Sequence, residues 1–109
     1  MKKTVVGLAG LTALYTLSLT GLAIAQDPVA EGKKMYEQEC ASCHMANGAG
    51  SGIYSPVNDL SKEKGLEMLK GYRDGTYGGS MKSVMAPFVK GKTDQQLEAL
   101  AAYMATLKK

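Results

Sequence analysis

The heptapeptide Glu39-Cys40-Ala41-Ser42-Cys43-His44-Met45 (ECASCHM) decides how this 109-residue chain can fold. It contains both cysteines and the single histidine of the sequence. On a helical turn, Cys40, Cys43 and His44 occupy positions i, i+3 and i+4, which face the same side. Two thiols and one imidazole are therefore available to one site.

Four kinds of site compete for these side chains. A structural zinc site needs four ligands, whereas the sequence has three Cys and His residues in all. A thioredoxin-like redox pair belongs to a βαβ unit, for which the sequence shows no strands, and a plain disulfide requires an oxidising compartment. The fourth kind is covalent attachment of haem, for which Cys-x-x-Cys-His is the signature.

We favour the haem site. Cys40 and Cys43 would form thioether bonds to the two vinyl groups of the porphyrin, and His44 would bind the iron. The composition agrees, because a chain with no Trp and one Phe has few large side chains to fill the centre of a small domain. We therefore predict one covalently bound haem c, whose apolar porphyrin completes the core.

The second axial ligand of the iron cannot be another histidine, which leaves Met, a deprotonated Lys, Tyr, water or an open position. Met45 follows His44 too closely to reach the opposite side of the haem. Three other methionines lie in predicted helices, where Met commonly fills gaps in the core: Met35, Met68 and Met104.

Met81 and Met85 lie in a predicted loop. We predict Met85 as the axial ligand because Pro87 follows it, stiffens the loop and removes a competing backbone donor. Met81 stays open as the alternative. A Met ligand raises the reduction potential of the iron relative to a harder ligand.

Residues 1–25 have the pattern of a secretory signal peptide. Lys2 and Lys3 precede an apolar run that ends in Ala23-Ile24-Ala25, a small-x-small cleavage site. The run is also about as long as a membrane-spanning helix, so a retained anchor is the alternative. We predict cleavage after Ala25, which leaves residues 26–109 as one exported, periplasmic domain.

We predict three helices, joined by long loops, and no strand. Asp27 is a suitable N-cap for the first helix, and Thr93 with Gln96 forms a capping box for the last one. Loops of this length in a small domain commonly wrap a ligand. The predicted helices are residues 29–41, residues 61–72 and the segment after Thr93; the loops are residues 47–52 and 74–92.

With these features in place, the chain resembles the small class I cytochromes c, and most closely the cytochrome c-553 type, over nearly all of residues 29–108. The resemblance is carried by CASCH (40–44), GYRDGTYGG (71–79) and MAPFVKGKTDQQLEALAAYM (85–104). It implies an all-α class I cytochrome c fold, with three main helices and long loops wrapped around one covalent haem, and with the first and last helices crossing.

The resemblance also implies roles for single residues. The crossing helices would meet through Gly32 and Tyr36 on the first and Leu100 and Tyr103 on the last. The backbone carbonyl of Pro56 would accept a hydrogen bond from His44. Tyr72 and Tyr77 would lie near the haem.

The predicted function is that of a soluble, monomeric one-electron carrier and not an enzyme. It would dock transiently with larger redox partners, such as a dehydrogenase or membrane complex on one side and an oxidase, hydrogenase or reductase on the other. The net charge of +3, to which Lys2 and Lys3 contribute, is too small to indicate nucleic acid or stable membrane binding. A haem-based gas sensor, a peroxidase-like enzyme with a displaceable Met, and a subunit of a respiratory complex remain alternatives.

Overall fold

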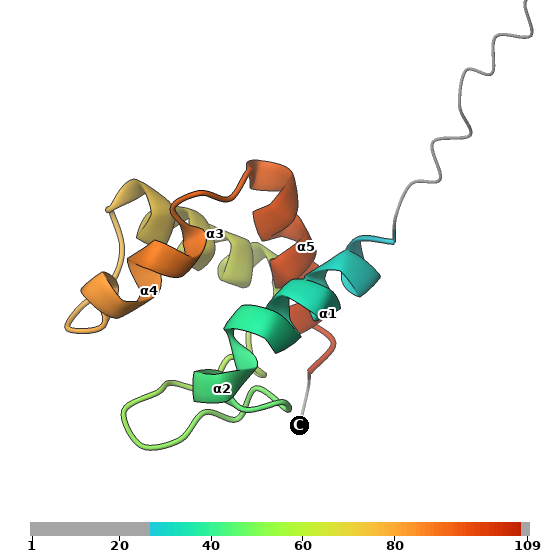
Figure 1. Cartoon of the computed structure of the whole chain (residues 1–109), viewed down its shortest axis with the longest axis horizontal. Helices are drawn as coiled ribbons and strands as arrows, with labels where there is room; N and C mark the ends of the chain where they lie inside the picture. Colours follow the sequence, from blue (N-terminus) through green and yellow to red (C-terminus); the bar gives the residue numbers. More distant parts are fainter. Residues whose placement is uncertain (1–26, 108–109) are drawn as a thin grey trace, which may run out of the picture.

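A computed structural model describes residues 27–107, and the predicted signal peptide and its cleavage site lie outside this range. The described part is helical, and its one β-type pairing is an isolated bridge between Ser51 and Tyr54. The all-α class is therefore confirmed. The helices, shown in Figure 1, are α1 (Pro28–Glu39), α2 (Ala41–His44), α3 (Lys62–Asp74), α4 (Lys82–Val89) and α5 (Asp94–Met104).

Helices α1, α3 and α5 are the three main helices expected from the sequence. The Asp27 side chain caps α1 by accepting a hydrogen bond of 3.0 Å from the Val29 amide. Helix α5 begins with the predicted capping box, in which the side chains of Thr93 and Gln96 each accept a backbone amide of the other residue. Such caps satisfy amides that have no partner within the helix.

The first and last helices cross at a position where their backbones touch (Figure 1). A Cβ atom on Gly32 would lie 1.9 Å from the carbonyl oxygen of Ala99, so only glycine fits there. One turn further along α1, the Tyr36 ring packs against Tyr103 with 5.3 Å between the ring centroids. Tyr36 and Leu100 are fully buried. The expected crossing and its contact residues are confirmed.

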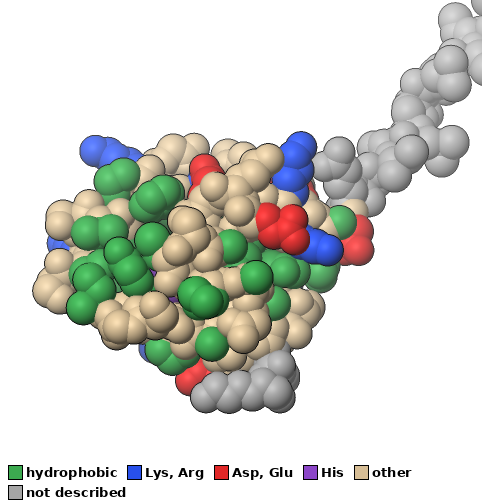
Figure 2. All heavy atoms as spheres, turned by 60° about the horizontal axis from the view of Figure 1, so that its bottom comes forward, with side chains coloured by type: hydrophobic (Ala, Val, Ile, Leu, Met, Phe, Trp, Pro, Cys, Tyr) green, Lys and Arg blue, Asp and Glu red, His purple; other side chains and the backbone are tan. Residues whose placement is uncertain are grey.

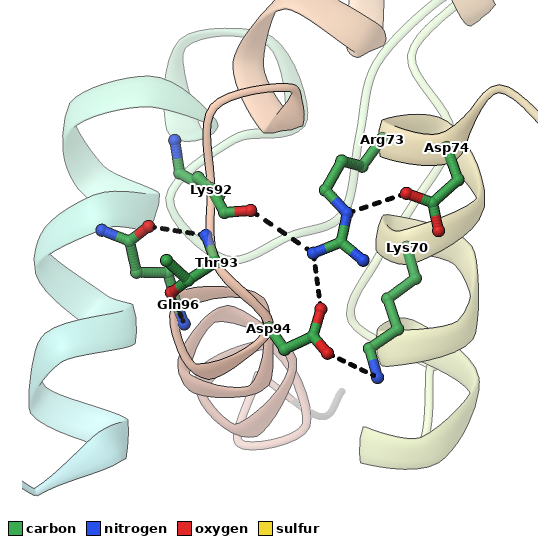
Figure 3. A network of polar contacts seen from close by, with 7 residues as sticks. All are labelled: Lys70, Arg73, Asp74, Lys92, Thr93, Asp94 and Gln96. Carbon is green, nitrogen blue, oxygen red and sulfur yellow. Dashed lines mark hydrogen bonds and ion pairs between the residues drawn. The ribbon is translucent and has the colours of Figure 1, made fainter.

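Helices α3 and α5 are joined at their ends by a network of charges (Figure 3). The Arg73 guanidinium, near the end of α3, donates to Asp94 at 2.6 Å and to the carbonyl of Lys92 at 3.4 Å. Lys70 lies 3.8 Å from the same Asp94 carboxylate. These contacts fix the start of α5, and the loop residues before it, against α3.

The segment 74–92 is not the uninterrupted loop predicted from the sequence, because it contains α4. Pro87 lies inside this helix. Its missing N–H removes one bond of the helix, but the amide of Met85 donates to Met81 and that of Lys90 donates to Ala86, so the helix continues on both sides. Helix α4 packs on α3 and buries Val89.

Within residues 27–107, no helix combines the length and the apolar character that crossing a membrane would require.

Candidate haem site

The predicted attachment residues lie at the turn that connects α1 and α2. The amide of Cys40 donates to the Tyr36 carbonyl at 2.8 Å, which ends α1, and the amide of His44 donates back to the Cys40 carbonyl at 3.0 Å. The spacing i, i+3, i+4 thus takes the helical geometry expected. Cys40, Cys43 and His44 all line one pocket, and both thiols are free.

The backbone behind His44 is held in a strained conformation. Met45 has φ 70° and ψ 156°, a region that residues other than glycine rarely adopt. The hydroxyl of Tyr36 donates to the Met45 carbonyl at 2.7 Å, and the Gly50 amide donates to the His44 carbonyl at 2.9 Å. Burial, more than its neighbours, raises the pKa of Tyr36 to about 12, so this phenol keeps its proton as a donor.

A backbone carbonyl orients the imidazole of His44. Its Nδ1 lies 2.8 Å from the Ser55 carbonyl oxygen, and because a carbonyl can only accept, Nδ1 carries the proton. The Nε2 lone pair is then left to bind a metal. The resemblance had implied the carbonyl of Pro56 for this contact. That assignment is wrong by one residue, because the carbonyl that reaches the ring is that of Ser55, directly after the Ser51–Tyr54 pairing.

Two adjoining pockets lie beside this turn. They contain about 560 and 800 Å³ of space not filled by protein atoms, a measure that includes space open to solvent. The residues that line both pockets come from α1, α2, α3, α4 and the loop after α2: Glu39, Cys40, His44, Ser55, Tyr72, Met85 and Phe88.

The two candidate methionines differ in their place at these pockets. Met85, in the middle of α4, lines both pockets together with His44. Met81 is the N-cap residue of α4 and lines only the smaller one. The arrangement favours Met85, although the reason given from the sequence, a loop stiffened by Pro87, does not apply within a helix. Met68 and Met104 also line the larger pocket.

Tyr72 and Tyr77 lie together at the larger pocket. Their rings meet edge to face, with 5.1 Å between the centroids, and Tyr72 lines both pockets. Burial, with Tyr77 as a smaller contributor, raises the pKa of Tyr72, so its hydroxyl remains a donor at neutral pH.

Hydrophobic side chains also surround the opening of the smaller pocket. Ile53 is 71% exposed, and Val84 and Phe88 are more than 40% exposed, although all three line this pocket. Figure 2 shows hydrophobic side chains gathered on one face of the molecule, with charged ones mainly at its margin. Apolar residues that remain exposed next to a large apolar pocket indicate a bound apolar group.

One feature of the site was not foreseen from the sequence. Glu39 and Lys92 form an ion pair of 2.6 Å at the larger pocket, beside Cys40. The two residues are distant in the sequence, and although Glu39 precedes Cys40 in the heptapeptide, no sequence pattern pairs it with Lys92. The pKa of the Cys40 thiol is raised to about 11, mainly by burial. The two charges of the pair act on it in opposite directions, because Glu39 raises this pKa further and Lys92 lowers it.

These residues fit a covalently attached haem. Two free thiols, an imidazole with its Nδ1 already bonded and a thioether border the smaller pocket, whose walls are mainly apolar, and all of them except Cys43 also line the larger one. The zinc alternative finds no support in the part of the chain that the structure describes. There, no three His, Cys, Asp or Glu side chains are grouped to hold a metal ion.

Comparisons with known proteins point the same way. A profile of the cytochrome c family matches residues 29–108. The chain is 38% identical over 80 residues to cytochrome c-553 of Nitratidesulfovibrio vulgaris (72% of this chain, 78% of the relative). It is 34% identical over 87 residues to cytochrome c-554(547) of Halothiobacillus neapolitanus (72% and 96%). It is 31% identical over 107 residues to cytochrome c6 of Thermosynechococcus vestitus (95% and 91%).

Proposed function

Since this chain belongs to the cytochrome c family, whose members carry covalently bound haem c and transfer electrons, we propose that it is a soluble periplasmic electron carrier with Cys40, Cys43, His44 and Met85 as its haem-binding residues. One observation carries the assignment of residues: side chains from the α1–α2 turn and from α4 border the same pocket. Cys40 and Cys43 would hold the haem covalently, and His44 and Met85 would bind its iron.

The bound haem supplies an iron that exchanges one electron between its ferric and ferrous states. The chain's own residues determine how that exchange occurs. The Ser55 carbonyl fixes the orientation of the His44 imidazole and increases its basicity as a ligand. His44 and Met85 together would fill both axial positions, which leaves no place for a substrate. The walls of the pocket are mainly apolar, and the exposed side chains at its opening are where a redox partner would approach.

The location and the partners are part of the proposal. The leader would direct export and be removed after Ala25, and the mature protein would act as a monomer that docks briefly with larger redox proteins. Mass spectrometry of the protein recovered from a periplasmic fraction tests the cleavage site. A mature chain that begins at Gln26 is expected, and a chain that retains residues 1–25 in the membrane fraction would contradict it.

Spectroscopy of the protein made in a host with haem-ligation machinery tests the residue assignment. The haem should stay with the polypeptide after extraction with acidified acetone, and C40A/C43A should lose it. The weak far-red band of iron–thioether coordination should vanish in Met85→Ala and persist in Met81→Ala. The reverse pattern would exclude Met85 as the ligand. Immediate carbon monoxide binding by the reduced wild type would favour a gas sensor.

A further inference from the structure

We propose that the Glu39–Lys92 ion pair sets the charge balance of the haem site and braces the helix that carries Met85 against the attachment turn. This inference rests on the proposed function, since it treats the pocket as the haem site. Both residues act through the haem ligands and are positioning residues. The relevant chemistry is a carboxylate and an ammonium held together beside a redox-active iron.

The pair is partly buried, with Lys92 more enclosed than Glu39. The Lys92 side chain is 12% exposed and the Glu39 side chain 38%, and the two charges are 2.6 Å apart. Glu39 Oε2 is buried, and its contact with the Lys92 ammonium is an ion pair that lacks the geometry of a hydrogen bond. Within residues 27–107, no other group donates a hydrogen bond to this oxygen. Breaking a buried pair by removing one member is costly because the other charge is left without compensation.

Both the side chain and the backbone of Lys92 are held by contacts. Its ammonium also donates to the Phe88 carbonyl at 2.7 Å, one turn beyond Met85 in α4. Its backbone carbonyl accepts from Arg73 of α3 at 3.4 Å, while its side chain extends away from that network (Figure 3). Glu39 is the last residue of α1 and precedes Cys40. The ammonium therefore connects the end of α4 to the attachment turn.

The sign of the electrostatic effect follows from the position of the pair. Both residues line the larger pocket, and both charges act on Cys40. Oxidation of the iron adds one positive charge to the site. A carboxylate nearby favours the ferric state and an ammonium disfavours it, and at a partly enclosed site these effects are larger than at the surface. Paired, they largely cancel.

Reduction potentials of the holoprotein and its variants test this. Glu39→Gln should raise the potential, because the ammonium is left alone, and Lys92→Gln should lower it, because the carboxylate is left alone. The double variant E39Q/K92Q should lie between the two single variants, and Lys92→Arg should stay close to the wild type. In addition, Lys92→Gln should lose the far-red thioether band at a lower pH than the wild type does.

A purely structural pair would give a different pattern. If the single variants shift the potential in the same direction, or do not shift it, the inference is overturned. Should Lys92→Gln fail to fold, Glu39→Gln alone must still raise the potential. The matched control is the pair Lys33–Glu37 on α1, whose side chains are 59% and 57% exposed and 3.9 Å apart. Lys33→Gln and Glu37→Gln should leave the potential unchanged.

The same experiment separates this inference from the proposed function. If the protein never acquires covalent haem, both fail. If it holds haem with a wild-type far-red band but the two single variants shift in parallel, the assignment of the haem ligands stands and only the role of the pair is wrong.

Discussion

At the scale of single residues, the backbone after His44 departs most from ordinary geometry. Met45 combines φ 70° with ψ 156° while its side chain stays largely exposed. It is the one non-glycine residue with positive φ in the described part of the chain. The conformation is imposed from both sides, by the Tyr36 hydroxyl on the Met45 carbonyl and by the Gly50 amide on that of His44. The turn holds the imidazole in place at the expense of backbone strain.

Replacing Met45 by glycine should relieve this strain. Residues in this region of φ and ψ cost on the order of 1–3 kcal/mol, part of which is offset because glycine gains more freedom in the unfolded chain. We expect Met45→Gly to raise the free energy of unfolding of the ferric holoprotein by about 1 kcal/mol, measured by urea denaturation. Ala46→Gly, at the next position, serves as control and should bring no gain. A Met45→Gly protein no more stable than the wild type would argue against strain.

Gly32 is constrained by space and not by φ. A methyl group there would meet the backbone of Ala99 at 1.9 Å and the Cβ of Tyr103 at 3.0 Å, so the helices would have to separate. We expect Gly32→Ala to cost at least about 3 kcal/mol of unfolding free energy, which is the upper part of the range for overpacking. Thermal unfolding followed by circular dichroism measures it. Gly91→Ala, where nothing lies within 4 Å of the added carbon, should change little. Equal stability of the two variants would contradict the close contact.

At the scale of elements, local signals predicted those helices whose ends are marked. Asp27 and Thr93 cap the helices that the sequence placed after them, and Ser61, the first residue of the predicted helix 61–72, caps α3. Helix α4 was missed because its Pro87 and the glycines before it are typical of loops, whereas its packing on α3 depends on residues distant in sequence. The prediction of Met85 as the iron ligand had assumed that Pro87 stiffens a loop, whereas both residues lie in helix α4.

The ion pairs of Asp94 in α5 with Arg73 and Lys70 in α3 should make the free energy of unfolding depend on pH in the acid range. The hydrogen bond from Arg73, followed by the charge of Lys70, lowers the pKa of Asp94 below its ordinary value of 3.8. A carboxyl with a lowered folded-state pKa contributes stability above its ordinary pKa and loses it as the pH falls through the folded value. Asp94→Asn should therefore be less stable than the wild type at pH 7, and the difference should shrink below about pH 4.

Urea denaturation of both proteins across this pH range measures the effect. Glu37→Gln is the control, because an exposed pair on a helix surface contributes at most about 1 kcal/mol. If the difference in the free energy of unfolding between Asp94→Asn and the wild type stays constant down to pH 3, the charge of Asp94 does not stabilise the contact between α3 and α5.

At the scale of the whole molecule, the sequence indicated the chemistry of the site more completely than its surroundings. Cys40, Cys43 and His44 lie in one short motif, so helical spacing was enough to predict that their side chains face the same side of the turn. The Glu39–Lys92 pair and the Arg73–Asp94 contact join residues from different helices and loops, and periodicity does not reveal such pairs. The shift from Pro56 to Ser55 as partner of His44 likewise depends on how one loop turns.

The haem should be a structural part of the core. The larger pocket is lined by buried residues of the helix core, among them Tyr36, Leu69 and Leu100, so the haem would pack directly against these side chains. Large cavities remove packing contacts that a small domain cannot spare. We expect C40A/C43A, made without haem, to show no cooperative thermal transition and reduced helical circular dichroism at 25 °C. A cooperative transition near that of the holoprotein would contradict this.

The contact of Gly32 with Ala99 affects the order in which parts of the chain can fold. Helix α1 finds its main partner in α5, at the other end of the described residues, and contacts between segments so far apart in sequence close slowly. A chain in which α5 has not yet formed lacks the main packing partner of α1. Until α5 docks, the end of α1 and the attachment turn are not held by this contact, so the thiols of Cys40 and Cys43 would stay accessible to the machinery that attaches haem.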